Sequence, residues 1–267
     1  MRDSTAPRCS STPERYGEEI LASADKQYAI IAGSGFQSFG DDAEGVTIST
    51  IYGDPSGPVR QLEYDDHTVY LLPRHGDDLS IPPHAINYRA NLQALRQLNV
   101  DTVIAMNTVG VISQNIHPGQ IAVPHQIIDY TWGRAHSIYD GTDGVDHIDF
   151  TEPFAEGLRQ GLLQAARSAD VNICDGGVYA ACQGPRLETA AEVNRLERDG
   201  ADFIGMTAMP EAALARELGI DYACLSLVVN YAAGRGKNTI HADIEASTMT
   251  AKMQSMKVLR EFFGVVE

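Results

Sequence analysis

Short apolar runs recur along the chain, and most of them end at a glycine or a small polar residue. A run of this length bounded by turn residues is typical of a buried strand. Because several of the runs are apolar throughout, they predict a sheet covered on both faces. The predicted strands are residues 28–32, 69–73, 100–109, 176–182, 202–205 and 222–229.

Helical patterns separate these strands. Apolar residues at helical spacing indicate a helix that follows Pro82 and ends at Leu98, with one buried face. Residues 46–72 alternate between apolar and polar and contain two turns, which favours antiparallel strands. We therefore expect an α/β domain over residues 28–267, preceded by a loose tail over residues 1–27. The other expected helices are residues 152–168, a segment that begins at the capping-box pair Thr189 and Glu192, and residues 210–219 and 244–263.

Charge and cysteine content narrow the class of protein. The 267 residues include 20 basic and 36 acidic ones, a net charge of −16, which disfavours binding to nucleic acid or to an anionic membrane. No apolar run approaches the roughly 20 residues of a membrane span, and the start of the chain lacks a signal-peptide core. The cysteines show no paired spacing, so we expect free thiols in a cytoplasmic protein. They are Cys9, Cys174, Cys182 and Cys224.

Polar side chains stand where the predicted strands end. Hydroxyls, one guanidinium and one amide at neighbouring strand ends would form an oxyanion site with a separate amide for a second part of the ligand. Neutral donors and a single arginine suit a phosphate that enters and leaves as a reactant. These residues are Ser34, Arg74, His75, Thr108, Thr207 and Asn230.

Each of these residues also has a structural interpretation. Arg74 could form a surface ion pair, Met206 could be a core residue, and Thr207 could supply the hydroxyl at the start of a helix. The irregular spacing of histidines and aspartates over residues 132–150 gives little support for a metal site. A dinucleotide site is also disfavoured, because Ser38 stands where the glycine pattern requires a third glycine.

Several motifs in the same order resemble the trimeric purine nucleoside phosphorylase and methylthioadenosine phosphorylase family. The resemblance implies a single-domain, three-layer α/β/α fold with a central mixed β-sheet flanked by helices, and a homotrimer. It covers about residues 28–234. The motifs are Gly33-Ser34-Gly35, Arg74-His75-Gly76, Asn87-Tyr88-Arg89-Ala90-Asn91, Thr108-Val109-Gly110, Glu152-Pro153-Phe154, Gln183-Gly184-Pro185-Arg186 and Gly205-Met206-Thr207-Ala208-Met209-Pro210-Glu211.

The resemblance also implies a reaction. Phosphate attacks the anomeric carbon of a purine nucleoside and releases the base and a sugar 1-phosphate, with no cofactor and no metal. Arg74, Thr207 and Asn230 would then be the catalytic residues. Phosphate would lie on Ser34, Arg74, His75, Thr108, Val109 and Thr207, and the nucleoside on Met206, His147, Leu187, Asn230, Tyr231 and Ala232.

Two segments bear on the nucleoside. Methylthioadenosine phosphorylases have an aspartate-rich base motif, whereas residues 230–232 here read Asn-Tyr-Ala. An amide suits a 6-oxopurine better than a 6-aminopurine, because it accepts from the protonated N7 and donates to O6. Residues 146–154 resemble the methylthio branch, in which a neighbouring subunit's histidine, here His147, closes the 5′ pocket. Together they favour a methylthioinosine-type substrate in purine salvage.

Four other functions stay open at this point. They are a methylthioadenosine phosphorylase with an unusual base site, a general inosine and guanosine phosphorylase, a non-catalytic purine nucleotide-binding module, and a dehydrogenase. The broken glycine pattern after Gly33 disfavours the dehydrogenase.

Overall fold

A computed structural model describes residues 8–9, 22–23, 26–36, 43–64, 67–142 and 144–264. Most of the predicted loose tail lies outside the described residues. Within it, β1 (Arg8–Cys9) pairs antiparallel with β9 (Ile173–Asp175). None of the described helices is long and apolar enough to cross a membrane.

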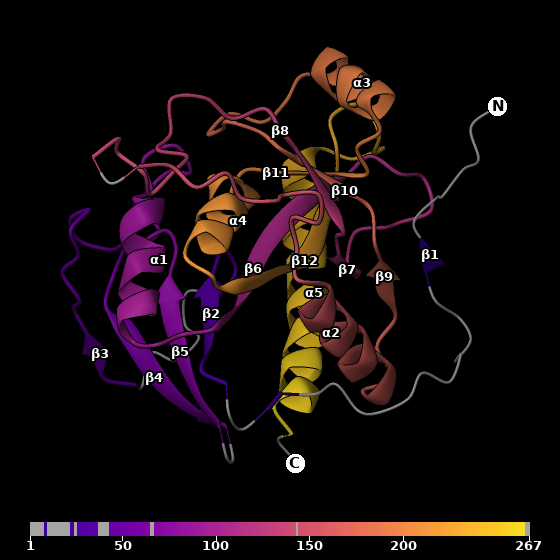
Figure 1. The fold of residues 1–267 in the computed structure, drawn as a ribbon. Coiled ribbons are helices and arrows are strands. Elements are labelled where there is room, and N and C mark those ends of the chain that lie inside the picture. Colours follow the sequence, from indigo (N-terminus) through magenta and orange to yellow (C-terminus); the bar gives the residue numbers. More distant parts are fainter. Residues whose placement is uncertain are drawn as a thin grey trace.

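A mixed sheet forms the middle of the molecule (Figure 1). Its centre consists of parallel strands in the order β12 (Asp221–Tyr231), β6 (Thr102–Val111), β2 (Tyr28–Ala32) and β5 (His67–Pro73). Beyond β5 lie β4 (Val59–Tyr64) and β3 (Gly45–Val46), both paired antiparallel. Beyond β12 lie β7 (Ile121–Val123) and β9. This arrangement confirms the predicted mixed sheet.

Three further strands branch from β6. These are β11 (Phe203–Gly205), β10 (Val178–Ala181) and β8 (Gln126–Asp129). The strand predicted from residue 176 begins at Val178, because Gly176 and Gly177 have positive φ angles that end the extended backbone.

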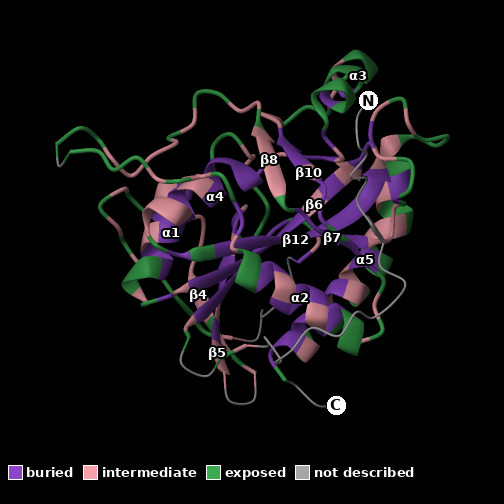
Figure 2. Ribbon diagram, turned by 45° about the vertical axis from the view of Figure 1, so that its right-hand side comes forward, coloured by how far each residue is buried: buried purple, intermediate pink, exposed green. Residues whose placement is uncertain are grey.

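Helices cover both faces of the sheet and confirm the three-layer prediction. On one face α1 (Tyr88–Gln97) and α4 (Ala208–Glu217) share a buried apolar cluster with the sheet. On the other face α2 (Glu156–Ser168) and α5 (Ile240–Phe262) do the same. α3 (Ala190–Asp199), which has the predicted capping box, packs over β10 and β11. The central strands are buried and the outer helix faces are exposed (Figure 2).

Two helices begin elsewhere than predicted. α2 begins at Glu156 rather than residue 152, because Ala155 is extended and its N–H donates to the carbonyl of Tyr222. α5 begins at Ile240 rather than residue 244, because the Thr239 side chain accepts from the Ala242 N–H and caps the helix there. The earlier start of α5 extends a helix face into the site described next.

Candidate active site

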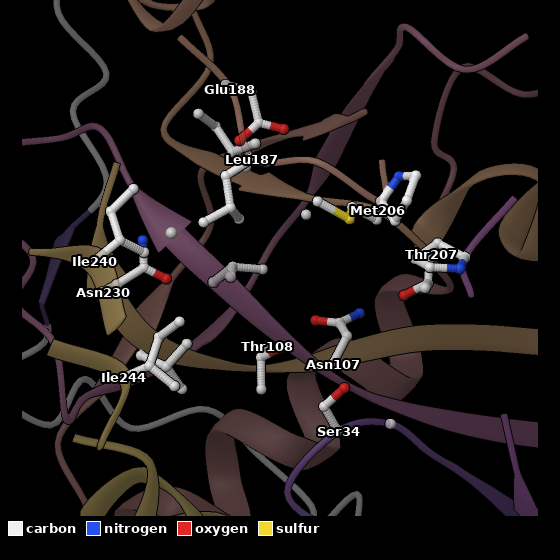
Figure 3. Close-up of a pocket in the computed structure, with 18 of the residues that line it drawn as sticks. Ser34, Asn107, Thr108, Leu187, Glu188, Met206, Thr207, Asn230, Ile240 and Ile244 are labelled. Atoms are coloured by element: carbon white, nitrogen blue, oxygen red, sulfur yellow. The ribbon is translucent and has the colours of Figure 1, made fainter. Parts of the chain in front are cut away.

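A pocket lies where the central strands meet α5 and the loop over residues 183–188 (Figure 3). All of the predicted site residues except His147 and Tyr231 line it. Thr207 and Asn230 lie on opposite sides of the pocket in the close-up. The predicted residues that line it are Ser34, Arg74, His75, Thr108, Val109, Leu187, Met206, Thr207, Asn230 and Ala232.

The two parallel N–H groups of the Arg74 guanidinium, Nε and Nη2, are bound to Glu211 and not to a ligand, in contrast to the sequence prediction. Its side chain is fully buried, and its Nε and Nη2 atoms each lie 2.8 Å from a carboxylate oxygen of Glu211. Nη1 donates to the Met106 carbonyl over 2.7 Å. Burial alone would lower the pKa of Arg74, but the charge and hydrogen bonds of Glu211 outweigh it and raise the pKa. Arg74 therefore lines the pocket as one half of a neutral ion pair, and one Nη1 hydrogen makes no hydrogen bond within the described residues.

Gly33 makes room for this arrangement. A Cβ atom at position 33 would lie 2.5 Å from the Met106 carbonyl oxygen and 2.7 Å from Nη1 of Arg74. Both distances are too short for a real Cβ contact. The glycine before Ser34 therefore has a packing reason in this structure: it lets the arginine approach the end of β2.

Three hydroxyls line the same end of the pocket. Ser34 lies in the turn after β2, and Thr108 lies within β6, which continues to Val111 instead of ending at residue 109. Thr207 precedes α4 but accepts no capping hydrogen bond. Met209 has extended backbone angles, so regular helix geometry begins at Pro210, as the sequence predicts. The hydroxyl of Thr207 is therefore not used as a helix cap.

His75 has a defined orientation in the pocket. Its Nδ1 lies 2.8 Å from the Ile81 carbonyl, which can only accept, so Nδ1 carries the proton. Burial lowers the pKa of His75, and the charge of Arg74 lowers it further. In the neutral ring Nε2 is an acceptor, and it suits a protonated phosphate oxygen.

A β-bulge directs Asn230 into the pocket. Val228 pairs with Val109 and Asn230 with Gly110, so one extra residue stands in β12. Because paired residues of parallel strands share a face, the bulge moves Asn230 to the face of Thr108. A Cβ atom at position 110 would lie 2.9 Å from the Asn230 Nδ2. That nitrogen donates to the Tyr231 carbonyl over 2.8 Å, which leaves the amide oxygen and one N–H for a ligand.

Sequence reasoning missed Glu188, which lines the pocket beside Leu187. Its Oε1 atom is buried and has no hydrogen-bond partner in the part of the chain that the structure describes. Burial raises the pKa of the Glu188 carboxyl, and hydrogen bonding with the Cys182 thiol only partly offsets that rise. Its loop position gives no periodic pattern, and an unpaired buried carboxyl oxygen in a pocket is a feature that only the fold reveals.

Sequence reasoning also missed the wall formed by α5. Ile240 and Ile244, one helical turn apart, line the pocket, whereas His241 between them is exposed and does not. Ile240 lies next to Asn230 in the close-up (Figure 3). Thr239 as a helix cap is the sequence feature that could have revealed this wall.

Two predicted residues lie elsewhere. The Tyr231 hydroxyl lies 3.0 Å from His117 Nδ1, outside the pocket, and Tyr231 approaches the site only through its main chain. His147 is exposed on the long loop and does not line this pocket. Its assignment to a neighbouring subunit stays a prediction.

Residues 27–264 match the family model of the Phosphorylase superfamily. The chain is 49% identical to a probable S-methyl-5′-thioinosine phosphorylase of Xylella fastidiosa over 211 residues, 78% of this chain and 85% of that protein. It is 48% identical to a protein of the same name from Pseudomonas syringae over 226 residues, 82% and 90% of the two chains. A 6-oxopurine nucleoside phosphorylase of Pyrococcus furiosus is 42% identical over 224 residues, 81% and 84%.

A solved structure shares the fold. The methylthioadenosine phosphorylase of Schistosoma mansoni in complex with adenine superposes with a TM-score of 0.83 and 30% identity, over 90% of this chain and 91% of that one.

Proposed function

We propose that this chain, which belongs to the Phosphorylase superfamily, is a purine nucleoside phosphorylase that cleaves S-methyl-5′-thioinosine. Inorganic phosphate would convert it to hypoxanthine and 5-methylthioribose 1-phosphate, a pentosyl transfer that salvages the purine. The relatives named S-methyl-5′-thioinosine phosphorylase support this substrate. The observation that carries the proposal is one pocket that combines hydroxyls, the Asn230 amide, the Glu188 carboxyl and an apolar α5 wall.

The end of the pocket near β2 suits phosphate. Ser34, Thr108 and Thr207 offer neutral donors, His75 offers an acceptor, and Arg74 offers one N–H from a neutral pair. These groups orient the phosphate toward the anomeric carbon. Because they are mostly neutral, they do not bind the unreacted phosphate so tightly that the reaction is slowed. As the glycosidic bond breaks, the positive charge on the sugar is stabilised by the phosphate itself. We propose that no cofactor or metal takes part.

The opposite end suits a 6-oxopurine. The free Asn230 oxygen accepts from N7–H as the leaving base takes up a proton, and its free N–H donates to O6. Glu188 is an acceptor for N1–H, and a 6-oxopurine carries that hydrogen whereas adenine does not. Two independent groups therefore favour the same class of base. In the reaction Asn230 acts on the leaving group, while Arg74 and Thr207 act on phosphate.

The α5 wall favours a 5′-methylthio group over a 5′-hydroxyl. Ile240 and Ile244 are apolar, and the exposed His241 supplies no polar group to the pocket. A hydroxyl buried against them would lose its hydrogen bonds to water, whereas a methylthio group gains contact. Met206 presents its thioether as the floor under the ribose.

We further propose a homotrimer in the cytoplasm. The trimer would let His147, exposed on its loop, close the 5′ pocket of a neighbouring subunit. Free thiols at Cys182 and Cys224 suit a reducing compartment. Light scattering tests the assembly, and a monomer would remove the role given to His147.

A general 6-oxopurine nucleoside phosphorylase is the second candidate. The Pyrococcus furiosus relative supports it, and Asn230 with Glu188 would serve inosine equally well. Incubation of methylthioinosine with and without inorganic phosphate, followed by chromatography of base and sugar phosphate, tests the proposed reaction. Phosphate-dependent hypoxanthine release is expected. Hydrolysis that needs no phosphate, or purine binding without cleavage, would refute it.

A further inference from the structure

A polar stripe crosses the buried strand β12. Tyr222, Cys224 and Ser226 occupy alternate positions, so they share one face, and each is at most 2% exposed. The sequence predicts this segment as a plain apolar strand. Buried polar groups cost free energy unless they are paired, so a stripe of three calls for an explanation.

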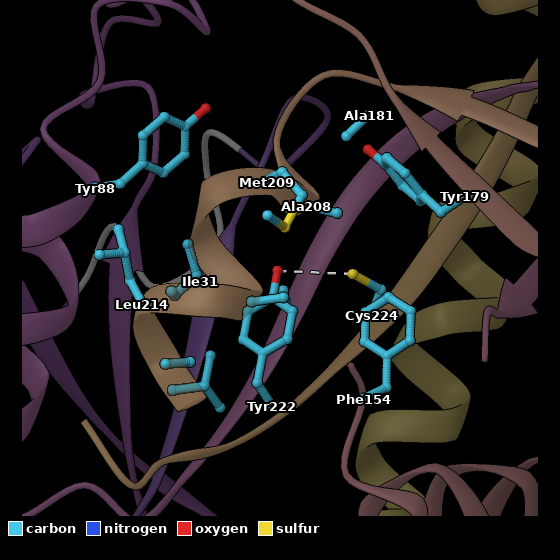
Figure 4. Close-up of a cluster of buried hydrophobic side chains, with 14 of the residues drawn as sticks. Ile31, Tyr88, Phe154, Tyr179, Ala181, Ala208, Met209, Leu214, Tyr222 and Cys224 are labelled. Atoms are coloured by element: carbon cyan, nitrogen blue, oxygen red, sulfur yellow. Dashed lines mark hydrogen bonds between the residues drawn. The ribbon is translucent and has the colours of Figure 1, made fainter. Parts of the chain in front are cut away.

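The stripe is part of a continuous hydrogen-bonded chain. Ser226 Oγ donates to Asn107 Oδ1 over 2.7 Å, and Asn107 Nδ2 donates to Cys224 Sγ over 3.1 Å. Cys224 Sγ in turn donates to the Tyr222 hydroxyl over 3.6 Å, the contact drawn in Figure 4. Tyr222 donates to Glu211 Oε2 over 2.8 Å. We call these residues the Glu211 chain.

Every bond of the Glu211 chain points the same way. Burial raises the pKa of Cys224 to about 12 and raises that of Tyr222, so both groups keep their protons and donate them. The donors therefore converge on the Glu211 carboxylate, which also receives Arg74. Bonds aligned head to tail polarise one another and hold their acceptor in one geometry.

The Glu211 chain reaches the pocket directly at Asn107 and, through the ion pair of Glu211, at Arg74. Arg74 and Asn107 both line it, and Asn107 directly precedes Thr108. Arg74 has one Nη1 hydrogen left for a ligand, so its direction depends on how the rest of the guanidinium is fixed. Glu211 fixes the opposite edge of that planar group. A rotation of the carboxylate would therefore change the direction of the remaining N–H.

We infer that the Glu211 chain positions Arg74 for phosphate, with Glu211 and Tyr222 as positioning residues that never touch the substrate. The inference rests on the proposed phosphorolysis but on no particular nucleoside. A purely structural role would be served as well by apolar side chains of similar size, because replacing both partners of a buried hydrogen bond costs little.

Matched variants at two positions test the inference. Tyr222→Phe removes the hydroxyl donor to Glu211 and keeps the ring. Because Glu211 then loses one of the donors that fix its orientation, we expect the phosphate KM to rise about tenfold. Cys224→Ala interrupts the chain one step earlier, whereas Cys224→Ser preserves a donor and an acceptor. A smaller rise is expected for the alanine variant, and the serine variant should return to near the wild-type value.

The measurements separate positioning from stability. Steady-state kinetics gives the phosphate KM and the nucleoside KM, calorimetric titration with inorganic phosphate gives Kd, and the melting temperature reports folding. The inference predicts that phosphate KM and Kd rise together while the nucleoside KM stays unchanged. Folded Tyr222→Phe and Cys224→Ala proteins with the wild-type phosphate Kd would overturn it, as would equal losses for both substrates or no rescue by serine.

The proposed function fails separately. A wild-type protein that releases no base in the presence of phosphate refutes phosphorolysis, and phosphate titration of the same variants then still tests the Glu211 chain. If the wild-type enzyme is active and the variants bind phosphate as tightly as it does, only the role of the Glu211 chain is refuted.

Discussion

The two ends of the pocket are built differently. At the phosphate end, Arg74 and His75 each make hydrogen bonds to main-chain carbonyls, and Arg74 is also paired with a buried carboxylate. At the nucleoside end, the walls are Leu187 and Glu188 on a loop and one face of α5, with a carboxyl oxygen left unpaired. The phosphate end is fixed by the sheet and its buried pairs, while the nucleoside end combines Asn230 of β12 with the loop and the helix that cover the sheet.

This difference separates reaction from substrate choice. Residues that are held by strands and by buried ion pairs cannot be substituted without loss of stability. We therefore expect them to determine the reaction that the site carries out. Side chains on a loop and on a helix face are replaced at lower cost, so they define which nucleoside fits. Substitutions at the two ends should therefore have different consequences.

The largest effect is expected for Arg74→Ala. It leaves Glu211 as a buried, unpaired carboxylate, which costs about 3–5 kcal/mol of unfolding free energy. Phosphorolysis should fall at least about a hundredfold, because the loss of one transition-state donor has that size. Urea denaturation and kcat/KM check both effects. Arg186→Ala is the control, because its pair with Glu192 is exposed and should contribute less than about 1 kcal/mol. Equal destabilisation in the two variants would contradict the account.

At the base end, Asn230→Asp should change selectivity without abolishing the reaction. An aspartate accepts from a 6-amino group but repels O6, so the kcat/KM ratio of methylthioadenosine to methylthioinosine should rise about 10- to 100-fold. Tyr231→Phe is the matched control, because the neighbouring hydroxyl faces His117. An unchanged ratio in the aspartate variant would mean that another group reads the base.

At the α5 wall, Ile244→Thr should reduce the preference for the 5′-methylthio group. A hydroxyl on this face offers a partner to a 5′-hydroxyl and removes apolar contact, so the methylthioinosine to inosine ratio should fall about tenfold. The phosphate KM, measured alongside, should stay constant. A change in phosphate KM instead would show that the two ends are coupled.

The smallest effect concerns pH at the phosphate end. Burial and the charge of Arg74 place the folded pKa of His75 below the ordinary 6.5. The neutral ring therefore predominates above 6.5 in both states, and its contribution to stability is lost as the pH falls below 6.5 toward the folded value. Because protonation removes the Nε2 acceptor, its hydrogen bond to a protonated phosphate oxygen should be lost as the pH falls through the lowered folded pKa. Ring titration by NMR checks this, and a His75 pKa at or above 6.5 would contradict it.

Much of the phosphate end was predictable, because strand ends can be located from apolar runs. Ser34, His75 and Thr207 lie in the pocket for that reason. The ion pair between Arg74 and Glu211 was not predictable. Glu211 lies 137 positions away in sequence, and its pattern indicated only a residue at the start of a helix. That both side chains of this ion pair are buried can be seen only in the folded structure.

The nucleoside end was harder to predict. Asn230 was expected at the end of a strand, whereas it lies within β12 and faces the pocket because of a bulge. Ile240 was missed because the predicted helix began four residues too late. Glu188 carries no periodic pattern at all. A bulge, a helix cap and a loop position these three residues, and the periodicity of hydrophobic residues predicts none of those features.

The most direct test of the account compares kcat/KM for methylthioinosine, methylthioadenosine and inosine at saturating phosphate. Asn230 and Glu188 predict that methylthioinosine exceeds methylthioadenosine, and the α5 wall predicts that it exceeds inosine, each by at least about tenfold. A preference for methylthioadenosine would contradict the assignment of the base end, and a preference for inosine would contradict that of the α5 wall.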